Sequence, residues 1–166
     1  MSAGSGWPQP EVWREPTPGE ELALLRRARS VAVVGASPNP SRASYFVSTY
    51  LTSATGFEVY FVNPRASQIL GRPVYPSLAA LPVVPDIVDV FRKAEDLPLV
   101  LEETLAVGSP VLWLQLGLWH PAVADAGARA GLTVVMNRCL KIEHARFHGG
   151  LHMAGFDTGV ISSRRR

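Results

Sequence analysis

Short continuous apolar runs alternate along the chain with longer segments in which apolar positions recur at helical spacing. The runs are rich in β-branched residues, which is typical of buried strands. They predict five strands, at residues 31–34, 58–62, 87–91, 111–116 and 132–136. The intervening segments predict helices at 17–29, 41–52, 94–107, 120–130 and 141–147, with a helical turn at 77–82.

This alternation predicts an α/β fold with a doubly wound, mostly parallel, five-stranded Rossmann-like sheet and helices on both faces. Ligands of such sheets bind at the carboxyl ends of the strands, near the switch point of the strand order. The residues that follow each strand are therefore the candidates for binding. They are Gly35-Ala36-Ser37, Asn63-Pro64-Arg65, Phe91-Arg92-Lys93, Leu116-Gly117 and Asn137-Arg138-Cys139.

The first strand, the glycine after it and the following helix predict a phosphate site. Gly35 permits a tight turn, and Asn39 and Pro40 suit the N-cap and the first position of the helix. Unpaired backbone N–H groups and the helix dipole would meet a phosphate there, together with the Ser37 hydroxyl and the Arg42 guanidinium. A glycine-ended strand that binds nothing is the alternative.

The glycines of a standard dinucleotide site are incomplete here. The pattern G-x-G-x-x-G would need glycine at the positions of Ser37 and Pro40, which argues against standard NAD binding. NAD sites also place a carboxylate about 20 residues further on, whereas this chain has Asn63, Pro64 and Arg65. An arginine there suits a ribose phosphate, as in NADP or coenzyme A, although a solvent-facing surface arginine is the alternative.

Composition indicates a single globular domain, since 47% of residues are hydrophobic and 18% are charged. We expect an extended segment at 1–19, the binding domain at 20–152 and a tail at 153–166. The net charge of +2 includes three C-terminal arginines, so no basic face for nucleic acid is predicted. One cysteine, no membrane-spanning apolar stretch and no signal-peptide pattern predict a cytoplasmic protein.

Five motifs, in order, resemble the small stand-alone CoA-binding proteins, which are similar to the N-terminal domain of the succinyl-CoA synthetase α subunit. The motifs are VAVVGASPNPSRASYFVSTYL, FVNPRASQILGRPVYPSLAALP, DIVDVFRKAED, WLQLGLW and VVMNRCLKIEH. The resemblance extends from about Glu20 to His148. It implies a Rossmann-like domain that binds coenzyme A.

The resemblance also implies which residues would contact coenzyme A. They are Gly35, Ala36, Ser37 and Arg42 at the phosphates, Asn63, Pro64 and Arg65 at the adenosine, Phe91, Arg92 and Lys93 in the next loop, and Gln115, Leu116 and Gly117 along the pantetheine arm. The chain departs from the family at Asn137, where the family commonly has aspartate. That departure puts an acid or base role at this position in doubt.

Two classes of function fit these observations. We favour a module that binds CoA or acyl-CoA without catalysis of its own, because the loops after the strands contain no paired carboxylates. The alternative is an enzyme, either an NADP-linked oxidoreductase or a partner-dependent acyl-CoA ligase subunit. In the synthetases, the resemblance implies a phosphorylated histidine from a second domain. A homodimer and an unidentified protein stay as alternatives for partners, and neither nucleic acid nor membrane is expected.

Several other residues have both a structural and a functional interpretation. Cys139 is predicted to be a small hydrophobic residue rather than a nucleophile. His144, His148 and His152 have the spacing of metal ligands on one helix, but glycines interrupt that helix, so no metal site is predicted. Trp113 and Trp119 are both predicted to pack in the core, with a position at the ligand cleft or against a partner as the alternative for Trp119.

Overall fold

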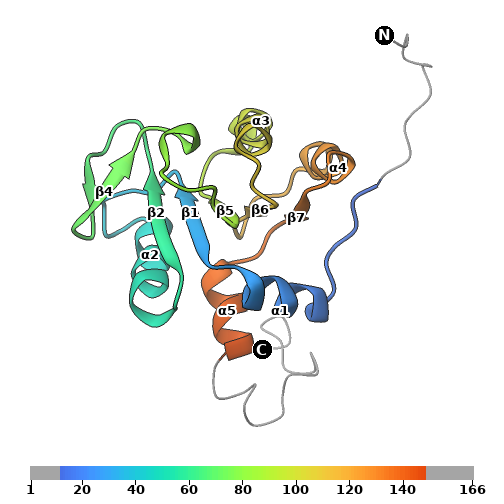
Figure 1. Cartoon of the computed structure of the whole chain (residues 1–166), viewed down its shortest axis with the longest axis horizontal. Coiled ribbons are helices and arrows are strands. Elements are labelled where there is room, and N and C mark those ends of the chain that lie inside the picture. The colour runs from blue at the N-terminus through green and yellow to red at the C-terminus, as the bar shows by residue number, and fades with distance from the viewer. Residues whose placement is uncertain (1–11, 149–166) are drawn as a thin grey trace.

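The computed structural model describes residues 12–148 as one sheet between two layers of helices (Figure 1). The strands are β1 (Ser30–Val34), β2 (Glu58–Val62), β3 (Gln68–Ile69), β4 (Arg72–Tyr75), β5 (Ile87–Val90), β6 (Val111–Leu114) and β7 (Thr133–Val135). The helices are α1 (Pro18–Arg27), α2 (Ala43–Ala54), α3 (Leu97–Val107), α4 (Pro121–Arg129) and α5 (Leu140–His148), with 3-10 turns η1 (Leu78–Ala80) and η2 (Ala94–Asp96).

The predicted doubly wound, mostly parallel sheet is confirmed, but the number of strands was wrong. The sheet has seven strands in the order β3-β4-β2-β1-β5-β6-β7. The five predicted strands form its parallel centre and one edge, and β4 extends the other edge parallel to β2. The last edge strand, β3, pairs with β4 in antiparallel fashion through a turn at Leu70 and Gly71. Both turn residues have positive φ, as a two-residue hairpin requires.

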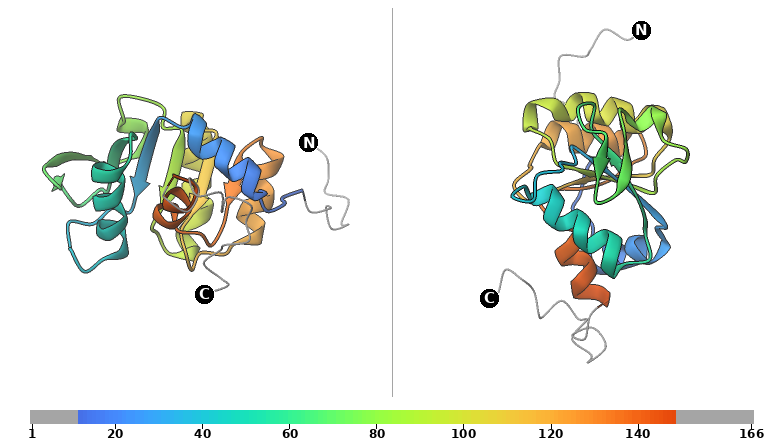
Figure 2. Two further views of the ribbon diagram at one scale, coloured as in Figure 1. Left: turned by 90° about the horizontal axis from the view of Figure 1, so that it is seen from below. Right: turned by 90° about the vertical axis from the view of Figure 1, so that its left-hand side faces the viewer.

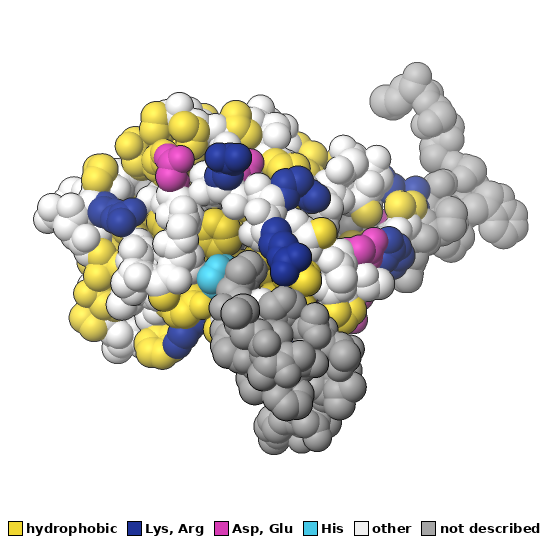
Figure 3. All heavy atoms as spheres, turned by 60° about the horizontal axis from the view of Figure 1, so that its bottom comes forward, with side chains coloured by type: hydrophobic (Ala, Val, Ile, Leu, Met, Phe, Trp, Pro, Cys, Tyr) yellow, Lys and Arg dark blue, Asp and Glu magenta, His cyan; other side chains and the backbone are white. Residues whose placement is uncertain are grey.

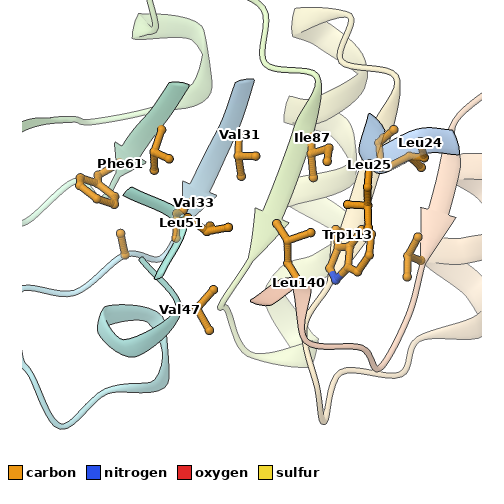
Figure 4. Packing of buried hydrophobic residues seen from close by; sticks show 14 of the residues in the cluster. Leu24, Leu25, Val31, Val33, Val47, Leu51, Phe61, Ile87, Trp113 and Leu140 are labelled. Carbon is orange, nitrogen blue, oxygen red and sulfur yellow. The ribbon is translucent and has the colours of Figure 1, made fainter. Parts of the chain in front are cut away.

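Helices α1, α2 and α5 cover one face of the sheet, and α3 and α4 cover the other (Figure 2). Val31 and Val33 of β1 pack on the first face, while Ala32 and Val34 pack on the second. This alternation buries both faces of the central strands. On the first face, Trp113 lies at full burial beside residues of α1 and α5 (Figure 4), which confirms its predicted place in the core.

Several predicted boundaries shift in the structure. Strand β5 ends at Val90 and β6 at Leu114, so Phe91, Gln115 and Leu116 belong to loops. Helix α2 begins only at Ala43, with Arg42 as the residue before it. The prediction that Asn39 and Pro40 begin this helix was therefore wrong.

A capping box fixes the start of α1. The Thr17 hydroxyl accepts a hydrogen bond from the Glu20 N–H, and the Glu20 carboxylate accepts one from the Thr17 N–H. Upstream, the Trp13 indole N–H donates to the Val134 carbonyl across 2.7 Å, which anchors the segment before α1 to strand β7. The described residues exclude His152, the predicted tail at 153–166 and positions 1–11 of the predicted extended segment.

Candidate functional site

Gly35 occupies the narrowest place at the carboxyl end of β1. Its φ is +85°, and a Cβ atom built there would lie 2.3 Å from the carbonyl oxygen of Phe91. The Gly35 N–H donates to the Val62 carbonyl, and the Phe91 N–H donates to the Val34 carbonyl. Only glycine fits this position, because any side chain would collide with the backbone after β5. The ends of β1, β2 and β5 are thereby held together.

The loop between β1 and α2 is fixed by short-range hydrogen bonds. The Ser37 N–H donates to the Ser44 hydroxyl across 3.1 Å, and the Ser37 hydroxyl accepts from the Asn39 N–H across 3.1 Å. Asn39 in turn accepts from the N–H and the hydroxyl of Ser41. Asn39 therefore closes a turn before the helix rather than capping it. The Ser37 hydroxyl keeps its own proton for a ligand.

Asn63 links the second loop to the first. Its side-chain amide donates to the Ala36 carbonyl across 2.7 Å, and its side-chain oxygen accepts from the Arg65 N–H across 2.8 Å. Pro64 and Arg65 are exposed beside it. The structure thus brings two of the predicted groups together and gives Asn63 the role of positioning Arg65.

The third loop adds two cations. Arg92 forms an ion pair with Asp96 at 3.2 Å, and its Cδ atom approaches the position of a Cβ on Gly35 to 3.0 Å. Lys93 is exposed next to it. With Arg42 and Arg65, the loops that follow β1, β2 and β5 contain four basic residues.

The fourth group divides into a buried and an exposed part. The Gln115 side chain is only 5% exposed, and its oxygen accepts from the Leu140 N–H, which fixes the start of α5. Leu116 is 65% exposed, and Gly117, at φ +92°, donates its N–H to the Asn137 side-chain oxygen across 2.7 Å. Asn137 itself has φ +58°, a conformation that asparagine tolerates better than most residues.

The remaining predictions concern the tryptophans, the cysteine and the histidines. Core packing was the wrong prediction for Trp119, which is 54% exposed and lies edge-on against Trp13 with ring centroids 5.7 Å apart. Cys139 is half-buried against the core on the α5 face. His144 is buried and hydrogen-bonded through Nδ1 to the Tyr50 hydroxyl at 2.8 Å. Between residues 12 and 148, no three His, Cys, Asp or Glu side chains group as metal ligands.

Two hollows lie away from these loops. One, of about 450 Å³, separates the segment around Trp13 from α1, and the other, of about 470 Å³, lies between α1 and the start of β2. Both lie apart from the strand-end loops. On the face formed by α1, α2 and α5, basic and acidic side chains are scattered rather than gathered (Figure 3). No helix in the described part of the chain is long and apolar enough to span a bilayer.

Known proteins are similar to this chain in sequence. The chain is 39% identical over 132 residues to the protein YneT of Bacillus subtilis (strain 168), which covers 80% of this chain and 97% of YneT. It is 37% identical over 73 residues to the ADP-forming acetate–CoA ligase I of Archaeoglobus fulgidus, which covers 44% of this chain and 10% of that enzyme.

A solved structure has the same fold. A hypothetical protein from Pyrococcus horikoshii OT3 superposes with a TM-score of 0.76 at 35% identity, over 80% of this chain and 93% of that one. The sequence model of the CoA binding domain family matches residues 29–145, a range that includes every strand of the sheet and the loops described above. The chain therefore belongs to the CoA binding domain family.

Proposed function

We propose that this chain binds coenzyme A at the carboxyl edge of β1, β2 and β5, as a binding module without catalysis of its own in the cytoplasm. The observation that carries the proposal is the juxtaposition of the glycine turn at Gly35 with cations from three separate loops. The backbone can approach a ligand closely at Gly35, and the start of α2 offers unpaired N–H groups. Membership of the CoA binding domain family supports the choice of ligand.

The pyrophosphate and the 3′-phosphate of coenzyme A each have complementary groups at this edge. The pyrophosphate would lie at the start of α2, where the helix dipole, the Ser37 hydroxyl and Arg42 favour negative charge. The 3′-phosphate of the ribose would pair with Arg65, whose backbone Asn63 holds in place. Lys93 would add a further cation, while part of the charge of Arg92 is already matched by Asp96.

The proposal of no catalysis rests on the residues around the edge. None of the five strand-end groups contains an aspartate, glutamate or histidine that could form a carboxylate pair or serve as the base beside a nucleophile, as acyl or hydride transfer would require. A partner-dependent acyl-CoA ligase subunit is the second candidate, favoured by the similarity to the acetate–CoA ligase of Archaeoglobus fulgidus. An NADP-linked oxidoreductase is the third, favoured by Arg65 alone.

Calorimetry of the full chain with CoA, NADP and NAD separates these candidates. We expect saturable binding of CoA with one site per chain and weaker binding of NADP and NAD. Absence of heat and of any thermal shift at millimolar CoA would contradict the proposal. Turnover of acyl-CoA, ATP and CoA by the isolated chain would replace the binding module with an enzyme.

A further inference from the structure

Two large apolar side chains are exposed in the loop that joins β6 to α4, one at the position predicted for the pantetheine arm and one further along the loop. Leu116 is 65% exposed and Trp119 is 54% exposed. The whole loop from Gln115 to Trp119 carries no charged side chain. It is nevertheless a fixed loop, because the Leu118 N–H donates to the Gln115 carbonyl and the Gly117 N–H to Asn137. An ordered apolar surface at the end of a polar site calls for an apolar occupant.

The segment before α1 builds part of this surface. In Figure 1 the segment passes α4 and β7 before it reaches α1. The backbone N–H groups of Val12 and Trp13 both donate to the Asp125 carboxylate, and the Trp13 indole donates to Val134. Trp119 lies edge-on against the ring of Trp13, at an interplanar angle of 86°. The rings of Trp13 and Trp119 therefore form an aromatic surface, the aromatic wall, that hydrogen bonds of the segment before α1 hold in place.

The topology leads a bound ligand from the phosphate site to this wall. Helix α2 follows β1 on one face, and α3 follows β5 on the other, so the switch point lies between β1 and β5. A ligand that starts at α2 and crosses this point continues toward β6 on the α3 and α4 face. Leu118 packs on that same face.

The length of the ligand agrees with this path. Strand β6 is the second strand from β1, a lateral distance of about 10 Å at the usual strand spacing. The pantetheine arm has about the backbone length of four residues, or roughly 14 Å when extended. The sulfur of a bound CoA would then lie over the loop that contains Leu116 and Trp119.

We propose that this site takes apolar acyl-CoA thioesters in preference to free CoA, with the acyl chain lying on Leu116 and Trp119. The inference rests on the proposed function and adds to it the class of ligand. The thioester carbonyl lies past the charged loops, and the methylenes displace water from the two exposed side chains. Complete burial of one methylene group strengthens binding about fourfold, but an exposed protein surface removes only about half of each methylene from water. Affinity therefore rises about twofold for each added methylene.

The test compares free CoA, acetyl-CoA, butanoyl-CoA and hexanoyl-CoA by calorimetry with the full chain. Hexanoyl-CoA is expected to bind at least tenfold more tightly than acetyl-CoA. Trp119→Ala should reduce this ratio threefold or more and leave the affinity for free CoA within about twofold. Leu99→Ala is the matched control, because Leu99 is also an exposed apolar residue, at 57%, but lies on α3.

The outcomes separate the two proposals. If free CoA binds but chain length has no effect, the acyl site is wrong and the CoA site stands. An equal loss of the ratio in Leu99→Ala also overturns the acyl site, since the effect would then not belong to the β6–α4 loop. If none of the four ligands binds, the proposed function fails as well.

Discussion

Gly117 and Asn137 join the loops after β6 and β7 through a hydrogen bond of 2.7 Å from the glycine N–H to the asparagine side chain. The bond lies at the position where the resemblance to CoA-binding proteins would have placed an aspartate. An asparagine oxygen accepts this bond as an aspartate oxygen does. The geometry therefore gives Asn137 a positioning role that needs an acceptor and no charge.

Removal of the Asn137 side-chain oxygen should destabilise the protein, whereas its replacement by a charged aspartate oxygen should not. We expect Asn137→Ala to lower the free energy of unfolding by about 1–2 kcal/mol, because the hydrogen bond is lost and alanine is strained at positive φ. Asn137→Asp should stay within about 0.5 kcal/mol of the original protein. Urea unfolding followed by circular dichroism measures both. A large loss in Asn137→Asp would show that the charge matters.

Gly35→Ala should be far more damaging than alanine at another glycine of similar conformation. The new Cβ would lie 2.3 Å from the Phe91 carbonyl oxygen, which is backbone and cannot rotate away. We expect a loss of more than about 3 kcal/mol, or failure to fold. Gly108 has φ +81° but no atom within 4 Å of its Cβ position, so Gly108→Ala should cost only about 1–2 kcal/mol. If thermal unfolding shows the same loss of stability in Gly35→Ala and Gly108→Ala, the collision with the Phe91 carbonyl is not the cause.

The sequence predicted the central sheet because β1 and β6 contain continuous apolar runs and β5 is interrupted only by Asp89, a pattern typical of parallel strands buried on both faces. It missed β3 and β4 because these strands are short and partly exposed, and Arg72 and Pro73 interrupt the apolar pattern. The hairpin turn has positive φ at both Leu70 and Gly71, and of these two residues only the glycine is a sequence signal for such a turn. Leucine is an uncommon residue in that conformation, so the signal was weak.

The candidate site was predicted less completely than the fold. The strand-end rule found Gly35 and Asn63, because position along a strand fixes which residues reach the edge. It could not tell that the Gln115 side chain turns inward to hold α5, since that depends on a contact with Leu140. The exposure of Trp119 was also missed, because its partner Trp13 comes from a segment more than a hundred residues away.

Arg65→Ala should remove the preference for CoA over dephospho-CoA. A guanidinium grips a phosphate with two hydrogen bonds, and a hydrogen bond to a charged group contributes about 1.5–3 kcal/mol. We therefore expect CoA to bind about tenfold less tightly to the variant, with the affinity for dephospho-CoA nearly unchanged. Arg27→Ala, which changes another exposed arginine on α1, is the control and should alter neither affinity. Equal weakening of both ligands would mean that Arg65 acts through the shape of its loop.

Asp89 of β5 should be replaceable by an apolar residue with a gain in stability. The side chain is fully buried, and neither carboxylate oxygen has a hydrogen-bond partner among the described residues. Burial raises the pKa of Asp89 well above its usual range, because the charged carboxylate is disfavoured away from water. We expect Asp89→Val to raise the free energy of unfolding by at least about 1 kcal/mol at pH 7. A loss of stability in chemical denaturation would indicate that Asp89 has a partner.

Glu21 of α1 should make the protein less stable as the pH rises. Burial, and then the negative charge of Glu143 on α5, raise the pKa of Glu21 to about 8 from an ordinary value of 4.5. Between these two values the folded state holds a proton that the unfolded state has lost. The contribution of Glu21 to stability is therefore fully present below pH 4.5 and declines until about pH 8.

Glu21→Gln should remove this decline, because glutamine keeps a side-chain donor without a titrating proton. We expect the variant to exceed the original protein in free energy of unfolding by at least about 1 kcal/mol at pH 8, with little difference at pH 5. Chemical denaturation at both pH values measures the effect. Glu102→Gln, at an exposed position of α3, is the control and should leave the pH profile unchanged. The free energy of unfolding of Glu21→Gln and that of the original protein could instead change with pH in the same way. Glu21 would then already be ionised in the folded state, with its repulsion from Glu143 offset by Arg138 and Arg146.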